Sequence, residues 1–218
     1  MTTIGILGGT GPAGRGVAMR LANSGRNVVL GSRDFERAQE VARGLLPRGK
    51  GTITGATNEE AALCKTVVVA TPWESAVGMV RSLRSQLAGK TVVSMVNALV
   101  REGREIVPLY SPRGSMAAQI AFTLPDSRIV GAFHHLPAAM MEDQDSDLDA
   151  DVVIFSDHAD DRQRIAELVD EMDGLRALIA GSMSLAGSIE AFTAACVSIN
   201  MRYKSQSYMK LNVVAANS

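Results

Sequence analysis

The first fourteen residues constrain the fold of this chain more than any other segment. An apolar run over residues 3–7 predicts a buried strand, and it leads through a glycine-rich turn into a helical stretch. Gly9, Gly11 and Gly14 have the G-x-G-x-x-G spacing in the strand–turn–helix setting that dinucleotide binding requires. The free N–H groups and the dipole of the following helix favour a bound diphosphate, whereas the alternative is a purely structural turn. We predict that the cofactor contacts of this turn come from Gly9, Thr10, Gly11, Pro12, Ala13 and Gly14.

The end of the second predicted strand indicates which dinucleotide binds. The apolar run over residues 27–30 ends in Gly31, Ser32 and Arg33, about 20 residues after the glycine turn, where NAD-specific proteins place an acidic residue on the ribose. Here a hydroxyl and a guanidinium stand instead, and a guanidinium binds phosphate through charge-assisted hydrogen bonds. Arg37 adds a second cation one helical turn later. We predict that Ser32, Arg33 and Arg37 select NADP over NAD, although both arginines also suit ordinary exposed positions.

Strands and helices alternate along the chain with short connections. This pattern predicts an α/β fold, a Rossmann-like, doubly wound, mostly parallel sheet with helices on both faces and a short C-terminal helical extension. We predict one domain over residues 1–218, with a dinucleotide-binding core over 1–134 and a C-terminal part over 135–218 packed over the site. The helix expected over residues 185–201 is apolar almost all round, so it should be buried in the core or against a second subunit, which favours a homodimer.

Composition limits the partners that the chain can have. It is 46% hydrophobic with a formal net charge of −1, so a core is available and there is no general attraction to nucleic acid or to membranes. No uncharged apolar run approaches the roughly 18 residues of a membrane span, and no signal-peptide pattern opens the sequence. Cys64 and Cys196 lack metal or redox spacing and are expected to be buried free thiols. These features predict a cytoplasmic protein without a metal site.

The segments after the fourth and fifth predicted strands carry further candidate residues. Ligands of open α/β sheets bind outside the carboxyl ends of the strands. Thr71, Pro72 and Trp73 follow the fourth strand, where Pro72 ends the strand and Trp73 suits either a core position or a wall of the nicotinamide site. Asn97 follows the fifth strand and suits a hydrogen bond to the cofactor amide or within a turn.

Two adjacent histidines follow the sixth predicted strand, which covers residues 128–133. Adjacent residues of a strand point in opposite directions, so we expect at most one of His134 and His135 to face a ligand. Either a proton-shuttling or a hydrogen-bonding histidine is compatible with this place, and so is a purely structural pair. Leu136 and Pro137 complete this segment as candidate substrate contacts.

Several of these segments together resemble one family, the NADPH-dependent coenzyme F-420 reductases, also called reduced coenzyme F-420:NADP oxidoreductases. The resemblance covers nearly the whole chain, from Ile4 to about Met201. Its most specific parts are the Leu-Gly-Gly-Thr-Gly turn at residues 7–11, Gly-Ser-Arg at 31–33 and Pro-Trp-Glu at 72–74, in that order. Arg20-Leu21-Ala22, the His134 to Ala139 segment and Asp173 to Arg176 add to it.

The resemblance implies a direct hydride transfer between NADP(H) and the 8-hydroxy-5-deazaflavin coenzyme F-420. Both carriers move two electrons, so the protein mainly has to position two flat rings. It further implies NADP contacts at Thr10, Gly11, Ala13, Ser32, Arg33 and Arg37, nicotinamide contacts at Thr71, Pro72 and Trp73, and deazaflavin contacts at His134, Leu136 and Pro137. Two other hypotheses stay open: an NADPH-dependent reductase of an imine, ketone or metal chelate with His134 or His135 as proton donor, and an NADP-sensing module without turnover.

Overall fold

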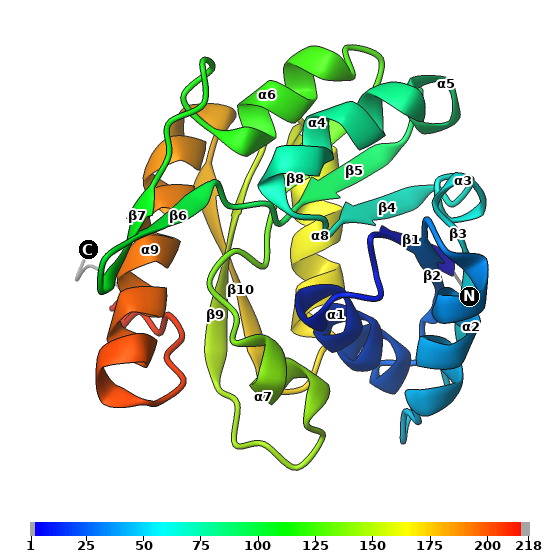
Figure 1. The fold of residues 1–218 in the computed structure, drawn as a ribbon, viewed down its shortest axis with the longest axis horizontal. Coiled ribbons are helices and arrows are strands. Elements are labelled where there is room, and N and C mark those ends of the chain that lie inside the picture. The colour runs from blue at the N-terminus through cyan, green and yellow to red at the C-terminus, as the bar shows by residue number, and fades with distance from the viewer. Residues whose placement is uncertain (1–2, 215–218) are drawn as a thin grey trace.

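The computed structural model describes residues 3–214 and contains an eight-stranded sheet in the order β10-β9-β8-β5-β4-β1-β2-β3 (Figure 1). Its strands are β1 Thr3–Leu7, β2 Asn27–Ser32, β3 Ile53–Thr57, β4 Thr66–Val69, β5 Thr91–Ser94, β8 Arg128–Gly131, β9 Ala150–Phe155 and β10 Leu175–Gly181. The six neighbouring strands β3, β2, β1, β4, β5 and β8 are parallel to one another. Strand β9 runs antiparallel to β8, and β10 is parallel to β9. The predicted mostly parallel, Rossmann-like sheet is confirmed.

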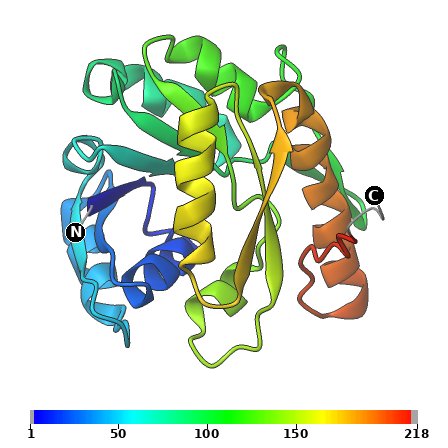
Figure 2. The same ribbon diagram turned by 180° about the vertical axis from the view of Figure 1, so that it is seen from behind.

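Helices cover both faces of the sheet and enclose two layers of hydrophobic core (Figures 1 and 2). One face carries α1 Pro12–Asn23, α2 Phe35–Gly44, α7 Ala138–Glu142 and α8 Ala159–Asp170; the other carries α3 Asn58–Ala61, α4 Trp73–Ser82, α5 Arg84–Leu87 and α6 Met116–Thr123. The alternation of side chains along each strand creates this division, because Ile4 and Ile6 of β1 enter one layer while Leu7 enters the other. The expected division of the chain at residue 134 stays a prediction.

The structure also contains elements that were not predicted from the sequence pattern. A hairpin of β6 Leu99–Glu102 and β7 Glu105–Pro108 forms a separate two-stranded sheet, and α6 follows it. Gly103 opens the two-residue turn of the hairpin with a φ of +60°, as glycine does at the first position of such turns. Residues 73–87 form two helices, α4 and α5, which are divided at Leu83.

The C-terminal helix α9, Ala186–Tyr203, packs against β7 and α6 at one edge of the molecule (Figure 1). Its inward side buries Thr193, Ala194 and Cys196, but Phe192 is 47% exposed and Ile199 is 45% exposed. Of the two expected places for this helix, the core does not cover all of it, since one apolar face is open in the single chain, and burial of that face against a second subunit stays a prediction. Within residues 3–214, no helix is both long enough and apolar enough to cross a membrane.

Candidate functional site

The loop between β1 and α1 places main-chain donors at the carboxyl edge of the parallel strands. The Gly8 N–H donates to Oδ1 of Asn58 at 3.0 Å, and the Gly9 N–H donates to the carbonyl oxygen of Gly31 at 2.8 Å. Gly11 is the N-cap of α1 and provides no side-chain acceptor, and the first turn of the helix contains no acidic residue. The N–H groups of the first turn have no acceptor within the helix, so they are available to an anion.

The three glycines of the motif differ in how much space surrounds the position that a Cβ atom would occupy. A Cβ atom on Gly9 would lie 2.6 Å from Cδ1 of Leu30, and one on Gly14 would lie 2.7 Å from the Cα atom of Gly9. Gly11 is different, because the nearest atom to its Cβ position is the carbonyl oxygen of Gly8, at an ordinary 3.7 Å. Gly9 and Gly14 are therefore required by packing, whereas Gly11 exposes its main chain to open space.

A cleft of about 690 Å³ extends from this loop over the ends of β2 and β4. Among the residues that line it are seven predicted ones: Thr10, Gly11, Ser32, Arg33, Arg37, Thr71 and Pro72. Asn58, the first residue of α3, also lines the cleft, although no ligand contact was predicted for it. Its buried side chain, which fixes the Gly8 amide, could not be recognised from spacing because the two residues are 50 positions apart.

The end of β2 excludes the acidic residue that NAD-binding proteins use. A Cβ atom on Gly31 would lie 2.9 Å from Oδ1 of Asn58 and from the carbonyl oxygen of Ile6, so no side chain fits at this position. Asp34 is directed to α2, where its side chain accepts a hydrogen bond from the Arg37 N–H at 3.0 Å and caps the helix. The carboxylate at this end of the cleft is therefore already engaged in local structure.

The cations of this region are available to a ligand. Arg33 and Arg37 are exposed and line the cleft, and the part of the chain that the structure describes gives neither of them an ion pair. The buried Ser32 lies beside them at the end of β2. Two uncompensated guanidinium groups next to a hydroxyl form a suitable environment for a phosphate group.

The other end of the cleft has an unsatisfied hydroxyl. Oγ1 of Thr71 is buried, and no hydrogen-bond partner for it exists in the described residues. A buried polar atom without a partner is costly, and a ligand amide or hydroxyl would remove that cost. Together with the free N–H groups of α1 and the cations at Arg33 and Arg37, this atom fits an extended, 2′-phosphorylated dinucleotide. Trp73 begins α4 and packs, partly buried, against the second core layer rather than lining the cleft.

Asn97 and His134 bind each other instead of facing the cleft. The amide nitrogen of Asn97 donates to the main-chain oxygen of His134 at 3.1 Å, and its Oδ1 lies 3.0 Å from Nδ1 of His134. Thr193 of α9 donates to the same main-chain oxygen at 3.2 Å. Since the amide oxygen can only accept, Nδ1 of His134 carries the proton and Nε2 does not. These contacts join the ends of β5 and β8 to α9.

The ring of His134 is buried and stacked on Phe155, with ring centroids 5.5 Å apart. Its Nε2 is buried without a partner in the described chain. Burial, with a smaller effect of neighbouring His135, lowers the pKa of His134 from 6.5 to about 3, so the ring is neutral at physiological pH. This histidine therefore serves as a fixed structural contact in the observed conformation, and its predicted contact with a ligand is untested.

The second histidine is also held inside the protein. Nε2 of His135 donates to the carbonyl oxygen of Ile189 at 2.6 Å, and its ring meets the edge of Phe192. Burial lowers its pKa as well. The expected strand ends at Gly131, and Phe133 has a left-handed φ of +66°, so the opposite-sides rule for strands does not apply to this pair. Leu136 packs on the first core layer and the buried Pro137 precedes α7.

Comparison with known proteins agrees with this site. The sequence profile described as coenzyme F420-dependent NADP oxidoreductase matches residues 3–98. The F420-dependent NADP reductase of Methanocaldococcus jannaschii is 33% identical over 93% of this chain and 94% of its own length, and that of Methanothermobacter thermautotrophicus is 32% identical over 91% and 89%. A crystal structure from Arthrobacter sp. FB24, described as a candidate F420-dependent NADP reductase, has a TM-score of 0.80 at 22% identity and covers 97% of this chain and 100% of its own. This chain therefore belongs to the F420-dependent NADP oxidoreductase family.

Proposed function

We propose that this oxidoreductase transfers a hydride between NADP(H) and the 8-hydroxy-5-deazaflavin coenzyme F420. The observation that carries the NADP half is the cleft. Along it lie Arg33 and Arg37, which have no ion pair within residues 3–214, the first-turn N–H groups of α1 and the buried hydroxyl of Thr71. The support for coenzyme F420 as the second substrate comes from two relatives that match over more than 90% of this chain and are named F420-dependent NADP reductases.

The residues of the chain have binding and orienting tasks in this reaction. The bound pair supplies hydride chemistry between two flat two-electron carriers, so no protein nucleophile is needed. Ser32, Arg33 and Arg37 hold the 2′-phosphate, and the first-turn N–H groups of α1 hold the diphosphate. Thr71 hydrogen-bonds the nicotinamide end, with Pro72 beside it.

His134 has a positioning role in this proposal. Its neutral ring, bonded to Asn97 and stacked on Phe155, joins the ends of β5 and β8 beneath α9. A reductase of imines or ketones would require a proton donor at the cleft. Nε2 of His134 is unprotonated and buried, and Nε2 of His135 donates to Ile189, so neither offers that proton. The geometry therefore favours the deazaflavin reaction over this alternative.

The visible absorbance of coenzyme F420 provides the test. NADPH, enzyme and the oxidised deazaflavin should together bleach this absorbance, and NADH at the same concentration should be much less effective. An absence of bleaching combined with oxidation of NADPH by an imine, ketone or ferric chelate would contradict the proposal. Tight NADPH binding without turnover of any acceptor would indicate a sensing module.

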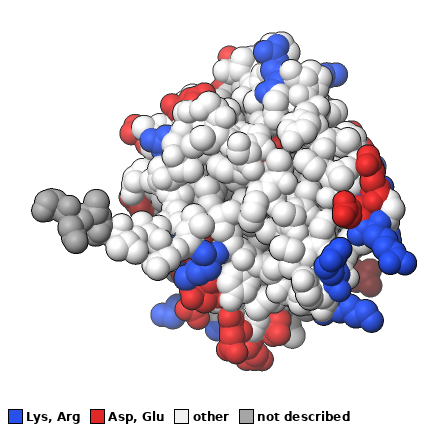
Figure 3. Space-filling view, turned by 90° about the vertical axis from the view of Figure 1, so that its left-hand side faces the viewer, with Lys and Arg blue, Asp and Glu red and all other residues white. Residues whose placement is uncertain are grey.

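We also propose that the chain is a homodimer that pairs through α9. Figure 3 shows the face that carries α9 and the β6–β7 hairpin, with an uncharged centre and charges at the rim. Leu185, Phe192 and Ile199 are exposed at seven-residue intervals, the spacing of a helix–helix seam, and Tyr203 continues this face. A second copy would cover the exposed apolar surface without bringing like charges together.

Sedimentation at micromolar concentration tests this assembly. The wild-type chain should sediment as a dimer and Phe192→Asp as a monomer, whereas a stable wild-type monomer would contradict it. Glu74→Lys, an exposed change on α4 and away from α9, is the matched control. A cytoplasmic location is proposed as well, because Cys64 and Cys196 are free thiols.

A further inference from the structure

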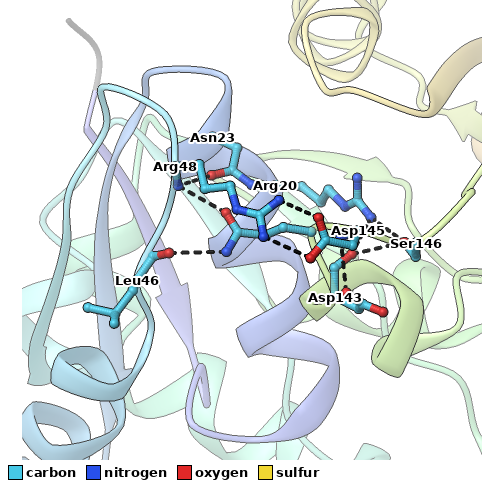
Figure 4. Close-up of polar contacts among 8 residues, drawn as sticks. Arg20, Asn23, Leu46, Arg48, Asp143, Asp145 and Ser146 are labelled. Atoms are coloured by element: carbon cyan, nitrogen blue, oxygen red, sulfur yellow. Dashed lines mark hydrogen bonds and ion pairs between the residues drawn. The ribbon is translucent and has the colours of Figure 1, made fainter.

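Arg20, on α1, is a buried cation that binds main-chain oxygens. Its side chain reaches toward the loop after α7 (Figure 4), and the residue is only 5% exposed. Burial lowers the pKa of its guanidinium, while the nearby charges of Asp173 and Asp143 oppose that shift. The guanidinium donates to the carbonyl oxygens of Met140 (2.7 Å), Met141 (3.1 Å), Asp143 (3.0 Å) and Asp173 (3.2 Å), and to Oγ of Ser146 (2.8 Å).

Three of these acceptors lie at the C-terminal end of α7. This helix has five residues, Ala138–Glu142, and a helix of that length is not stable by itself. The last carbonyl groups of a helix have no partner within it, and its dipole favours a cation at this end. Arg20 supplies both the donors and the charge, so α1 caps α7 from outside.

Close packing holds α7 against α1 along its length. A Cβ atom on Gly16 would lie 2.6 Å from Cβ of Met141 and 3.1 Å from the carbonyl oxygen of Ala138, so glycine allows the two helices to touch. Nε of Arg15 pairs with the carboxylate of Glu142 at 2.9 Å near the start of α1. The position of α7 is therefore set by α1.

A groove of about 420 Å³ lies between the first turn of α1 and α7. Pro12 and Arg15 line one side of it, and Ala138, Ala139 and Glu142 line the other. It begins beside the dinucleotide loop, and its α7 wall directly follows Leu136 and Pro137. The start of α1 therefore borders both cavities, since Thr10 and Gly11 line the NADP cleft and Pro12 lines the groove.

We propose that Arg20 is a positioning residue for the second substrate, because its cap on α7 holds the wall of the α1–α7 groove where the deazaflavin enters. This inference rests on the proposed function. Arg20 lies eight residues beyond Pro12, about 12 Å along the same helix. One rigid helix thus binds the diphosphate at its start and holds the α7 wall of the groove from its last turn. Hydride transfer between stacked rings depends on such placement, since a displacement of about 1 Å can reduce the rate about 100-fold.

Steady-state kinetics of the full-length enzyme test the role of Arg20. Arg20→Met should raise the KM for the deazaflavin about tenfold or more and leave the KM for NADPH within about twofold, since the dinucleotide cradle is untouched. Arg20→Lys keeps the charge but loses the fork of donors, so it should recover part of the loss. Arg48→Ala is the matched control, because exposed Arg48 binds Asp145 of the same loop from outside (Figure 4) and should leave both KM values near wild type.

Amide hydrogen exchange provides a second readout that does not require turnover. Arg20→Lys should speed exchange over residues 138–146 and leave residues 8–16 unchanged. Equal changes in both KM values, no change in either, or unchanged exchange over 138–146 would overturn the inference. If Arg20→Met does not fold, the lysine variant carries both measurements. If the wild-type enzyme does not bleach the deazaflavin, the proposed function fails, and the exchange experiment still decides whether Arg20 caps α7.

Discussion

Two alanine substitutions in the glycine motif should affect different properties: Gly14→Ala should lower stability, and Gly11→Ala should lower the affinity for the dinucleotide. Gly14→Ala would place a Cβ atom 2.7 Å from both the Cα and the carbonyl oxygen of Gly9, and neither main-chain atom can rotate away. Gly11→Ala meets no atom closer than 3.7 Å, and its φ of −74° suits alanine. The first change should therefore damage the fold, whereas the second should damage only the binding of the dinucleotide.

The magnitudes follow from these distances. Overpacking costs about 1–3 kcal/mol, and the rigid neighbours of Gly14 favour the upper part of that range. Alanine recovers about 1 kcal/mol within a helix, so the net loss is about 2 kcal/mol. For a chain of this size that loss corresponds to a fall in Tm of roughly 4–8 °C. At Gly11, the reduced entropy of the unfolded chain offsets the poorer N-cap, so Tm should stay within about 2 °C.

The assay combines thermal unfolding with titration of NADPH. A methyl group at residue 11 stands where the diphosphate meets the main chain, and the loss should be at least tenfold in Kd, or about 1.4 kcal/mol. Gly44→Ala, at the end of α2 where a Cβ atom meets nothing within 4 Å, is the matched control and should change neither quantity much. Wild-type affinity in Gly11→Ala, or a fall in its Tm equal to that of Gly14→Ala, would refute the reasoning.

Two further predictions concern charge. Arg33→Ala should weaken NADP binding roughly 10- to 100-fold while NAD changes little, because only NADP has the 2′-phosphate. Arg43→Ala, on α2 but outside the cleft, is the control, and equal losses for both nucleotides would contradict the assignment. Burial raises the pKa of Glu190 to about 7, partly opposed by the N–H groups of Ala117 and Met116. The folded state then holds this proton more tightly than the unfolded state, so its contribution to stability is complete below pH 4.5 and is lost as pH rises to about 7. Thermal melts of Glu190→Gln should gain stability relative to wild type across that interval, and a constant difference would exclude this linkage.

The nucleotide half of the site could be predicted from sequence because its residues are close together in the chain. Residues 8–14 and 31–33 follow or end adjacent parallel strands, so spacing alone predicted that they meet at one edge of the sheet. The support from Asn58 could not be predicted, since it depends on a contact across 50 residues.

The second half of the site depends on distant contacts. Arg20 meets its partners in and after α7 across more than 100 residues, and Asn97 meets His134 across 37. Asn97 suited a cofactor contact as well as any turn residue, and only the folded chain shows it bound to His134. The short helix α7 has almost no periodic signal of its own, because α1 supplies its packing and its cap.

The reversal of direction between β8 and β9 gives the sheet a seam. Over residues 3–214, β9 is registered against β8 by the single pair of Gly131 and Phe155, and the ring of Phe155 fills the space that a side chain at Gly131 would need. The ring of His134 stacks on the same phenyl ring. Local separation of β8 and β9 should therefore release His134 and break its hydrogen bond to Asn97 before any pair of parallel strands separates. Local opening at the β8–β9 junction and local opening of the parallel strands can therefore have different free energies within one continuous sheet.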